Sequence, residues 1–156
     1  MKQVAINGFG RIGRNVVRAL LEAPRNEFRI VAINDLAPAE TSARLLELDS
    51  THGRLGMPVS HGDGFIEVDG QRISYMSHRD PKACDWGGRG IELVMECTGI
   101  FTAADKASQH IDAGATRVLV SAPSKGADAT IVYGVNDKVL APEMKIISNA
   151  SCTTNC

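Results

Sequence analysis

Apolar residues alternate between two spacings along the first third of the chain. Short apolar runs over residues 4–6 and 28–34 have the length of buried strands. Between them, apolar residues recur at helical spacing, at Ile12, Val16, Val17, Leu20 and Leu21. Pro38 suits the first turn of a second helix, which continues toward Asp49. This alternation of strand and helix predicts βαβ units in a parallel sheet, and therefore an α/β fold.

Shorter apolar runs follow between residues 56 and 77. Runs over residues 57–59, 65–68 and 72–76 are separated by Gly62-Asp63-Gly64 and Asp69-Gly70, and Asp-Gly between strands is a hairpin signal. The parallel pattern then resumes with a strand over 91–96, a helix over 103–113 ended by Gly114, a strand over 117–121 and two apolar runs at 130–133 and 145–148. We therefore expect a Rossmann-type, doubly wound, mostly parallel sheet with a small antiparallel hairpin insertion.

Composition and charge narrow the classes of partner. The 156 residues carry 17 Lys+Arg and 18 Asp+Glu, a net charge of −1, which argues against a nucleic acid or an acidic membrane recognised by bulk charge. Apolar runs fall far short of the roughly 20 residues of a membrane span, and the first residues lack the features of a secretory signal. The 4 cysteines are sparse, which indicates reduced thiols in the cytoplasm, and neither Cys nor His shows the spacing of metal ligands.

A glycine motif lies between the first predicted strand and the first predicted helix. Residues 8–13 read G-x-G-x-x-G, in which Gly8 permits a tight turn, Gly10 lets the backbone approach a pyrophosphate, and Gly13 allows the helix to pack closely on the strand. Asp35 follows the second strand, where it would accept hydrogen bonds from ribose hydroxyls and repel a 2′-phosphate. The motif therefore predicts NAD rather than NADP. The alternative is a tight βα turn without a ligand, with Asp35 capping the next helix.

The last nine residues look like a strand that leads into the start of a helix. Cys152 lies at that start, a position that makes a thiol a better nucleophile, and the nearby hydroxyls and N–H groups could hold an oxyanion or a phosphate. The other interpretation is that Cys152 and Cys156 are small buried hydrophobes, and the residues alone leave both open. A nucleophilic Cys needs a base, and none is identified locally. His52 is the most noticeable candidate among the histidines, but a turn or capping role is expected for it.

These residues carry a resemblance to a known family. From residue 5 to its last residue, the chain resembles the N-terminal part of phosphorylating glyceraldehyde-3-phosphate dehydrogenases. The segments that carry the resemblance are residues 5–14, 33–35, 49–53, 79–81, 96–101, 121–125 and 148–156. The last of them, Ser-Asn-Ala-Ser-Cys-Thr-Thr-Asn-Cys, is highly specific for this family and its close relatives.

The resemblance implies a chemistry and a set of site residues. Cys152 would be the nucleophile that adds to glyceraldehyde 3-phosphate to give a thiohemiacetal; hydride then passes to NAD, and inorganic phosphate attacks the resulting thioester. Ser151 and Thr153 match positions that contact phosphate or substrate oxygens. The positions that match contacts to NAD are Gly8, Gly10, Arg11, Ile12, Gly13, Asn34, Asp35, Arg79, Thr98, Gly99 and Ser121. Among these, Arg79 would lie near the adenine and Ser121 near the nicotinamide.

The resemblance also implies a domain organisation. Residues 1–150 would form the NAD-binding domain, and residues 151–156 would begin a catalytic α+β domain. In the family the catalytic His and the arginines for the substrate phosphate lie in that second domain, and the histidines of this chain match none of those positions. We therefore expect a fragment, truncated before the catalytic domain, that binds NAD with little or no turnover. The full-length family members are homotetramers.

Two other functions stay open. Erythrose-4-phosphate dehydrogenases share the Cys motif but deacylate mainly with water, and residues 13–20 are similar to them. They tend to carry Glu in place of Asp35, and Tyr-Gly where this chain has Ile100-Phe101, so both differences favour the triose enzyme. The second alternative is a non-catalytic NAD-binding or redox-sensing module.

Overall fold

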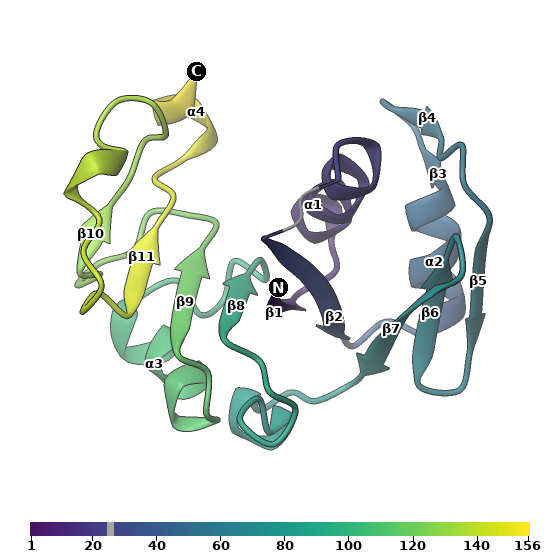
Figure 1. Ribbon diagram of the computed structural model, residues 1–156, viewed down its shortest axis with the longest axis horizontal. Coiled ribbons are helices and arrows are strands. Elements are labelled where there is room, and N and C mark those ends of the chain that lie inside the picture. Colours follow the sequence, from purple (N-terminus) through teal and green to yellow (C-terminus); the bar gives the residue numbers. More distant parts are fainter. Residues whose placement is uncertain (25–26) are drawn as a thin grey trace.

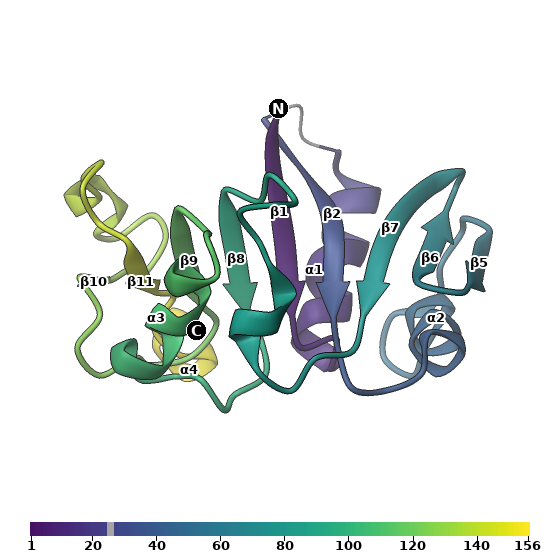
Figure 2. The ribbon, with the colours of Figure 1, turned by 90° about the horizontal axis from the view of Figure 1, so that it is seen from below.

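Parallel strands make up most of the central sheet. The structure is a computed structural model that describes residues 1–24 and 27–156. Its nine-stranded sheet runs in the order β10 (Ala129–Thr130), β11 (Ile146–Ser148), β9 (Arg117–Val120), β8 (Leu93–Glu96), β1 (Lys2–Asn7), β2 (Phe28–Asn34), β7 (Gln71–Met76), β6 (Phe65–Val68) and β5 (Val59–Gly62). In Figure 2, the arrows of β8, β1, β2 and β7 point to the same edge of the sheet.

The sheet changes its direction of growth at β1. This strand pairs in parallel with β2 on one side and with β8 on the other. From β1 the chain builds outward through β2 and β7, and it then returns to build the other half from β8. In doubly wound folds, ligands bind in the crevice outside the carboxyl ends of the strands at such a switch point. The predicted Rossmann-type architecture is therefore confirmed, and its binding crevice lies beyond Asn7 and Glu96.

Helices cover both faces of the sheet. Helix α1 (Arg11–Glu22) and α3 (Ala104–Asp112) lie on opposite faces (Figure 1), and α2 (Ala39–Glu47) covers the end formed by β5 and β6. The shorter helical elements are η1 (Pro81–Cys84), η2 (Asp137–Val139) and α4 (Cys152–Asn155). Within the described residues, no helix has the length and the apolar character that a membrane crossing requires.

Strand β1 contributes to the hydrophobic core on both of its faces. Val4 and Ile6 pack in one cluster with Val17 of α1, whereas Ala5 belongs to a second cluster with Trp86 and Val94. The two clusters lie on opposite sides because successive side chains of a strand point to opposite faces of the sheet. This double burial explains why the strand reads as a continuous apolar run, as parallel strands between helices do.

The antiparallel insertion is present as predicted. Strand β6 pairs antiparallel with β5 and with β7, and β7 pairs in parallel with β2, so β7 joins the insertion to the main sheet. Asp69 (φ 49) and Gly70 (φ 78) both have positive φ in the turn between β6 and β7, as a two-residue hairpin of this type requires. The first strand of the insertion covers Val59–Gly62, later than the predicted run over 57–59.

Two short segments differ from the prediction. The apolar run over 130–133 is not a strand beyond Thr130, because the chain turns at Gly134 (φ 78) and leaves Tyr133 85% exposed. The sequence pattern also gave no sign of the two-residue strands β3 (Leu48–Asp49) and β4 (Gly53–Arg54), which pair antiparallel. Their turn contains His52, whose backbone N–H donates to Asp49, so the expected turn role is confirmed.

Candidate functional site

The predicted cofactor residues meet at one edge of the sheet. Gly8, Asp35 and Thr98 follow closely on the carboxyl ends of β1, β2 and β8, which are neighbouring parallel strands. Arg11 and Ile12 form the first turn of α1, and Ser121 follows β9. Residues that are far apart in sequence are thus brought together at the switch point of the sheet.

Two of the motif glycines are required by close backbone contacts. Gly8 has φ 92, and a Cβ there would lie 2.7 Å from the backbone nitrogen of Thr98. A Cβ on Gly13 would lie 2.3 Å from the carbonyl oxygen of Gly8. Gly8 therefore lets the turn approach the end of β8, and Gly13 lets α1 pack on the turn, as predicted from the motif.

Gly10 differs from the other two, because it has open space beside it. A Cβ on Gly10 would meet nothing within 4 Å. Gly10 is also the N-cap residue of α1, and it has no side chain with which to cap the first N–H groups of the helix. These N–H groups and the positive end of the helix dipole suit an anion such as a pyrophosphate. The open space and the uncapped helix start together fit NAD.

Asp35 connects the glycine turn to the end of β2. Its Oδ2 accepts a hydrogen bond from the backbone N–H of Phe9, and its Oδ1 accepts one from Ala37 at 2.8 Å. The contact with Ala37 is a local turn contact and does not cap α2, because the N-cap of that helix is Pro38 and no side chain caps it. The alternative in which Asp35 caps the next helix is therefore wrong. The carboxylate also borders a hollow of about 260 Å³, whose lining residues are Asn7, Gly8, Asn34, Asp35, Leu36, His78, Arg79, Thr98, Ile100 and Phe101. A hollow with a carboxylate, apolar side chains and an arginine suits the adenosine half of NAD.

Asn34 lines this hollow and also makes buried hydrogen bonds beneath it. Its side chain is buried, and it donates to Asn7 Oδ1 at 2.7 Å and to the carbonyl oxygen of His78 at 2.9 Å. Its own Oδ1 accepts from the N–H of His78 at 2.8 Å. Asn34 thus holds the backbone of His78, and so places the neighbouring Arg79 at the hollow.

Glu96 was missed by sequence reasoning as a site residue. It ends β8, it is 1% exposed, and its Oε1 accepts hydrogen bonds from the backbone N–H of Thr98 at 2.7 Å and from the Thr98 hydroxyl. The Thr98 hydroxyl oxygen accepts in turn from Ile100, and Gly99 between them has φ 73. Glu96 therefore shapes the Thr98–Gly99 turn. The available signal was a carboxylate at the end of an otherwise apolar strand.

Cys152 is held at an exposed helix start. Ser151 is the N-cap of α4, and its hydroxyl oxygen accepts from the N–H of Thr154 at 3.0 Å. The Asn155 side chain donates to the carbonyl oxygens of Asn149 (3.0 Å) and Ser151 (2.9 Å). Cys152 itself is exposed, so the interpretation as a small buried hydrophobe is wrong. Thr153 lies next to it, with its hydroxyl 3.0 Å from that of Ser151.

The buried cysteines have a different chemistry. Burial raises the pKa of Cys84 to about 12 and that of Cys97 to about 11, although a hydrogen bond with Ser121 lowers the second in part. Both thiols therefore stay protonated near neutral pH. Because the thiolate is the reactive form of cysteine, neither is expected to act as a nucleophile. Among the described residues, no group of three His, Cys, Asp or Glu could hold a metal ion.

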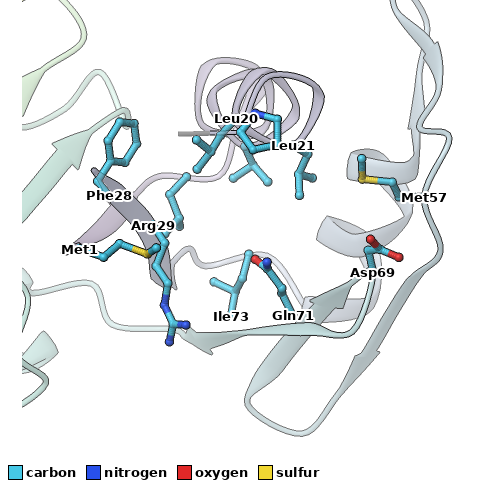
Figure 3. A pocket seen from close by; sticks show the side chains of 12 residues that line it. Met1, Leu20, Leu21, Phe28, Arg29, Met57, Asp69, Gln71 and Ile73 are labelled. Atoms are coloured by element: carbon cyan, nitrogen blue, oxygen red, sulfur yellow. The ribbon is translucent and has the colours of Figure 1, made fainter. Parts of the chain in front are cut away.

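A separate apolar hollow lies at the opposite edge of the sheet, where β1 and β2 begin. Its volume is about 330 Å³, and its lining includes Met1, Leu20, Leu21, Phe28 and Ile73 (Figure 3). Met1 and Phe28 lie at the amino ends of β1 and β2, whereas Gly8 and Asp35 follow their carboxyl ends. This hollow is therefore distinct from the cofactor site.

We expect Asp35→Ala to weaken NAD binding by roughly 10-fold to 100-fold, because hydrogen bonds to a charged group contribute more than neutral ones. The lost contact with Phe9 would loosen the turn for NAD and NADP alike, whereas the lost ribose contact affects NAD, so the gap between the two affinities should narrow. Calorimetric titration with each cofactor measures this. Asp63→Ala, in the exposed β5–β6 turn, makes the same change in net charge and should leave both affinities unchanged. Unaltered selectivity in Asp35→Ala would remove Asp35 from the ribose site.

Comparison with known proteins agrees with this geometry. Residues 2–104 match the family model described as the glyceraldehyde 3-phosphate dehydrogenase NAD binding domain. Proteins named glyceraldehyde-3-phosphate dehydrogenase are similar over 99% of this chain: those of Cereibacter sphaeroides (54% identical), Xanthobacter flavus (53%) and Geobacillus stearothermophilus (50%). The chain spans 46% of the length of each of these relatives. Fold, glycine turn and sequence similarity together place the chain in the glyceraldehyde-3-phosphate dehydrogenase family, in its NAD-binding part.

Proposed function

We propose that this chain supplies the NAD site and the nucleophile for the phosphorylating oxidation of glyceraldehyde 3-phosphate to 1,3-bisphosphoglycerate. One observation carries the proposal: the exposed Cys152 follows β11 at the sheet edge that also holds the glycine turn (Figure 2). Parallel strands direct their carboxyl ends to one edge, so the thiol and the cofactor turn share a side of the molecule.

The chemistry assigns one bond-forming step to this chain. The thiolate of Cys152 attacks the aldehyde carbon, which forms a C–S bond and places negative charge on the former carbonyl oxygen. When bound, NAD would supply the hydride acceptor for oxidation of the thiohemiacetal to a thioester. An oxygen of inorganic phosphate then attacks the thioester, and the C–S bond breaks to release the acyl phosphate and the Cys152 thiolate. Ser151 and Thr153 would bind phosphate or substrate oxygens next to the thiol.

A base for Cys152 is not supplied by His110. This residue is 0% exposed, and both of its ring nitrogens are within hydrogen-bond distance of other side chains, Trp86 at 3.0 Å and Glu96 at 2.8 Å. His52 lies in the β3–β4 turn, where its backbone and that of Thr51 lower the pKa of Asp49 by hydrogen bonding. We therefore propose that the 156 residues by themselves bind NAD and form little or no NADH from the substrate.

The domain division and assembly belong to the same proposal. We infer that residues 1–150 form the NAD-binding domain and that residues 151–156 begin the catalytic domain. By the family resemblance, the complete enzyme would be a homotetramer in the cytoplasm, and the four free thiols agree with that compartment.

The test is an assay of substrate and acyl acceptor. This chain would be joined after Cys156 to the second half of the Cereibacter sphaeroides relative, and NADH formation followed by absorbance with glyceraldehyde 3-phosphate or erythrose 4-phosphate, each with and without phosphate. Preference for the triose and a requirement for phosphate are expected. Preference for the tetrose without a phosphate requirement would move the assignment to erythrose-4-phosphate dehydrogenase, with water as the deacylating nucleophile. The 156 residues alone should bind NAD without turnover. Robust turnover by them would contradict the proposal that they do not supply the base for Cys152.

A further inference from the structure

A buried layer of polar side chains lies directly beneath the cofactor turn. We use the name polar layer for Asn34, Asn7, Glu96, His110 and Trp86, which form a continuous hydrogen-bonded chain. Asn34, Asn7 and Glu96 lie side by side at the ends of β2, β1 and β8. His110 comes from α3, and Trp86 follows η1. The layer therefore spans the switch point, from the end of β2 across β1 to the end of β8.

The hydrogen bonds of the polar layer have a fixed direction. An indole N–H can only donate, and that of Trp86 donates to His110 Nδ1 at 3.0 Å. Because Nδ1 accepts, the ring proton of neutral His110 is on Nε2, which donates to Glu96 Oε2 at 2.8 Å. Trp86 thus sets the tautomer of His110, and the tautomer requires an acceptor at residue 96.

Glu96 meets donors on both of its oxygens. Oε2 accepts from His110 and from the Asn7 amide at 2.6 Å, and Oε1 accepts from the backbone N–H and the hydroxyl of Thr98. A carboxylate accepts at both oxygens, whereas a glutamine amide would present an NH₂ group to one pair of these donors. In a site that is 1% exposed, water does not replace the lost acceptor.

The polar layer ends at the two turns that form the cofactor site. Asn7 directly precedes Gly8, and a Cβ on Gly8 would lie 2.7 Å from the Thr98 nitrogen, so these two turns touch. Glu96 accepts hydrogen bonds from Asn7, which leads into the Gly8 turn, and from Thr98 in the other turn, so it is linked to both turns. We propose that Glu96 is a positioning residue that holds the Gly8 and Thr98–Gly99 turns in the arrangement that binds NAD, and that Trp86, through His110, fixes the direction of its hydrogen bonds. The proposal concerns cofactor binding by this chain, and it is independent of the catalytic role of Cys152.

Two glutamine variants on either side of one hydrogen bond test the proposal. Glu96→Gln removes an acceptor, and we expect its NAD affinity to fall roughly 10-fold or more. His110→Gln can still donate its NH₂ to Glu96 and accept from Trp86 with its oxygen, so its affinity should fall by a smaller factor than that of Glu96→Gln. Calorimetric titration with NAD compares the two. Equal losses in both variants, or no loss in Glu96→Gln, would overturn the proposal.

A spectroscopic measurement separates positioning from a general effect on stability. Long-range ¹H–¹⁵N spectra of the histidine rings should show His110 with its proton on Nε2, and the single tryptophan gives one indole N–H signal that should shift when NAD saturates the chain. Ser42→Ala is the stability control, because it removes a buried hydrogen bond with Tyr75 (2.7 Å) outside the polar layer. We expect it to lower the melting temperature while keeping NAD affinity and the indole response.

The spectra also decide the case in which Glu96→Gln does not fold. A His110 proton on Nδ1, or an indole signal that is unmoved by saturating NAD, would overturn the proposal without any variant. Failure of the unmodified chain to bind NAD would be seen in the same titration, and it would overturn the cofactor site together with the positioning role.

Discussion

Cys152→Ser should lower NADH formation in the hybrid with the Cereibacter sphaeroides second half by a factor on the order of 10³ or more, since loss of a catalytic nucleophile has effects of that size or larger. A serine hydroxyl ionises far less readily than a thiol, and this chain places the group at an exposed helix start rather than beside a partner base. NAD affinity should be unchanged, because the cofactor turn is built from other strands. Steady-state absorbance assays and NAD titration measure the two quantities.

Cys156→Ser is the matched control for this substitution. Cys156 is also exposed, and its backbone N–H donates to the carbonyl oxygen of Cys152, so it lies one turn further along the same segment. We expect this variant to retain most of the activity. Comparable losses in both variants would show that the segment, and not the Cys152 thiol, is what matters, and retained activity in Cys152→Ser would refute the covalent mechanism.

Gly13→Ala and Gly8→Ala should each destabilise the fold by about 3 kcal/mol, which corresponds to a fall in melting temperature of roughly 6–12 °C. In Gly13→Ala the new Cβ would lie 2.3 Å from the Gly8 carbonyl oxygen, and the contact partner is backbone, which cannot move aside cheaply. In Gly8→Ala the positive φ adds strain to the 2.7 Å approach to Thr98. Thermal and urea unfolding measure the loss, and NAD binding should fall with it because the turn is displaced.

Gly10→Ala should have the opposite signature. Its backbone conformation, with φ −70, is open to alanine, and its Cβ would meet nothing within 4 Å, so the melting temperature should change little. The added methyl group would occupy the open space in front of the helix start, and we expect NAD affinity to fall by roughly 10-fold or more. A destabilised Gly10→Ala, or one with normal NAD affinity, would show that the open space is not the pyrophosphate position.

Local patterns were sufficient to predict the elements that build the cofactor turn. The first strand, the first helix and the acid after the second strand follow from hydrophobic spacing and from the glycine motif, since a buried strand and an amphipathic helix have different periods. The β6–β7 turn was also predictable, because Asp69-Gly70 adopts the positive φ values that few residues accept. Family resemblance added Cys152, for which local chemistry left two interpretations open.

The polar layer could not be predicted in the same way. Its bond between Asn7 and Glu96 joins residues 89 positions apart, and nothing in the local sequence shows that they are neighbours. The inward direction of Asn34 depends on a loop from beyond β7, through the contacts with His78. The end of β10 was missed for a related reason: whether an apolar run forms a strand depends on a pairing partner, and the residues after Thr130 instead enter a turn.

The order of strands across the sheet also has a consequence for how the chain folds. Strands β5, β6 and β7 are consecutive and joined by short turns, so bringing them together has a small loop-closure cost. Pairing β1 with β8 must close a far longer loop, as the 89-residue separation of Asn7 and Glu96 shows, and contacts of that kind form slowly. We therefore expect the β5–β6–β7 meander to form early and the crevice between β1 and β8 to form late. NAD should then bind only when the fold is nearly complete, and it should not affect the early steps of folding.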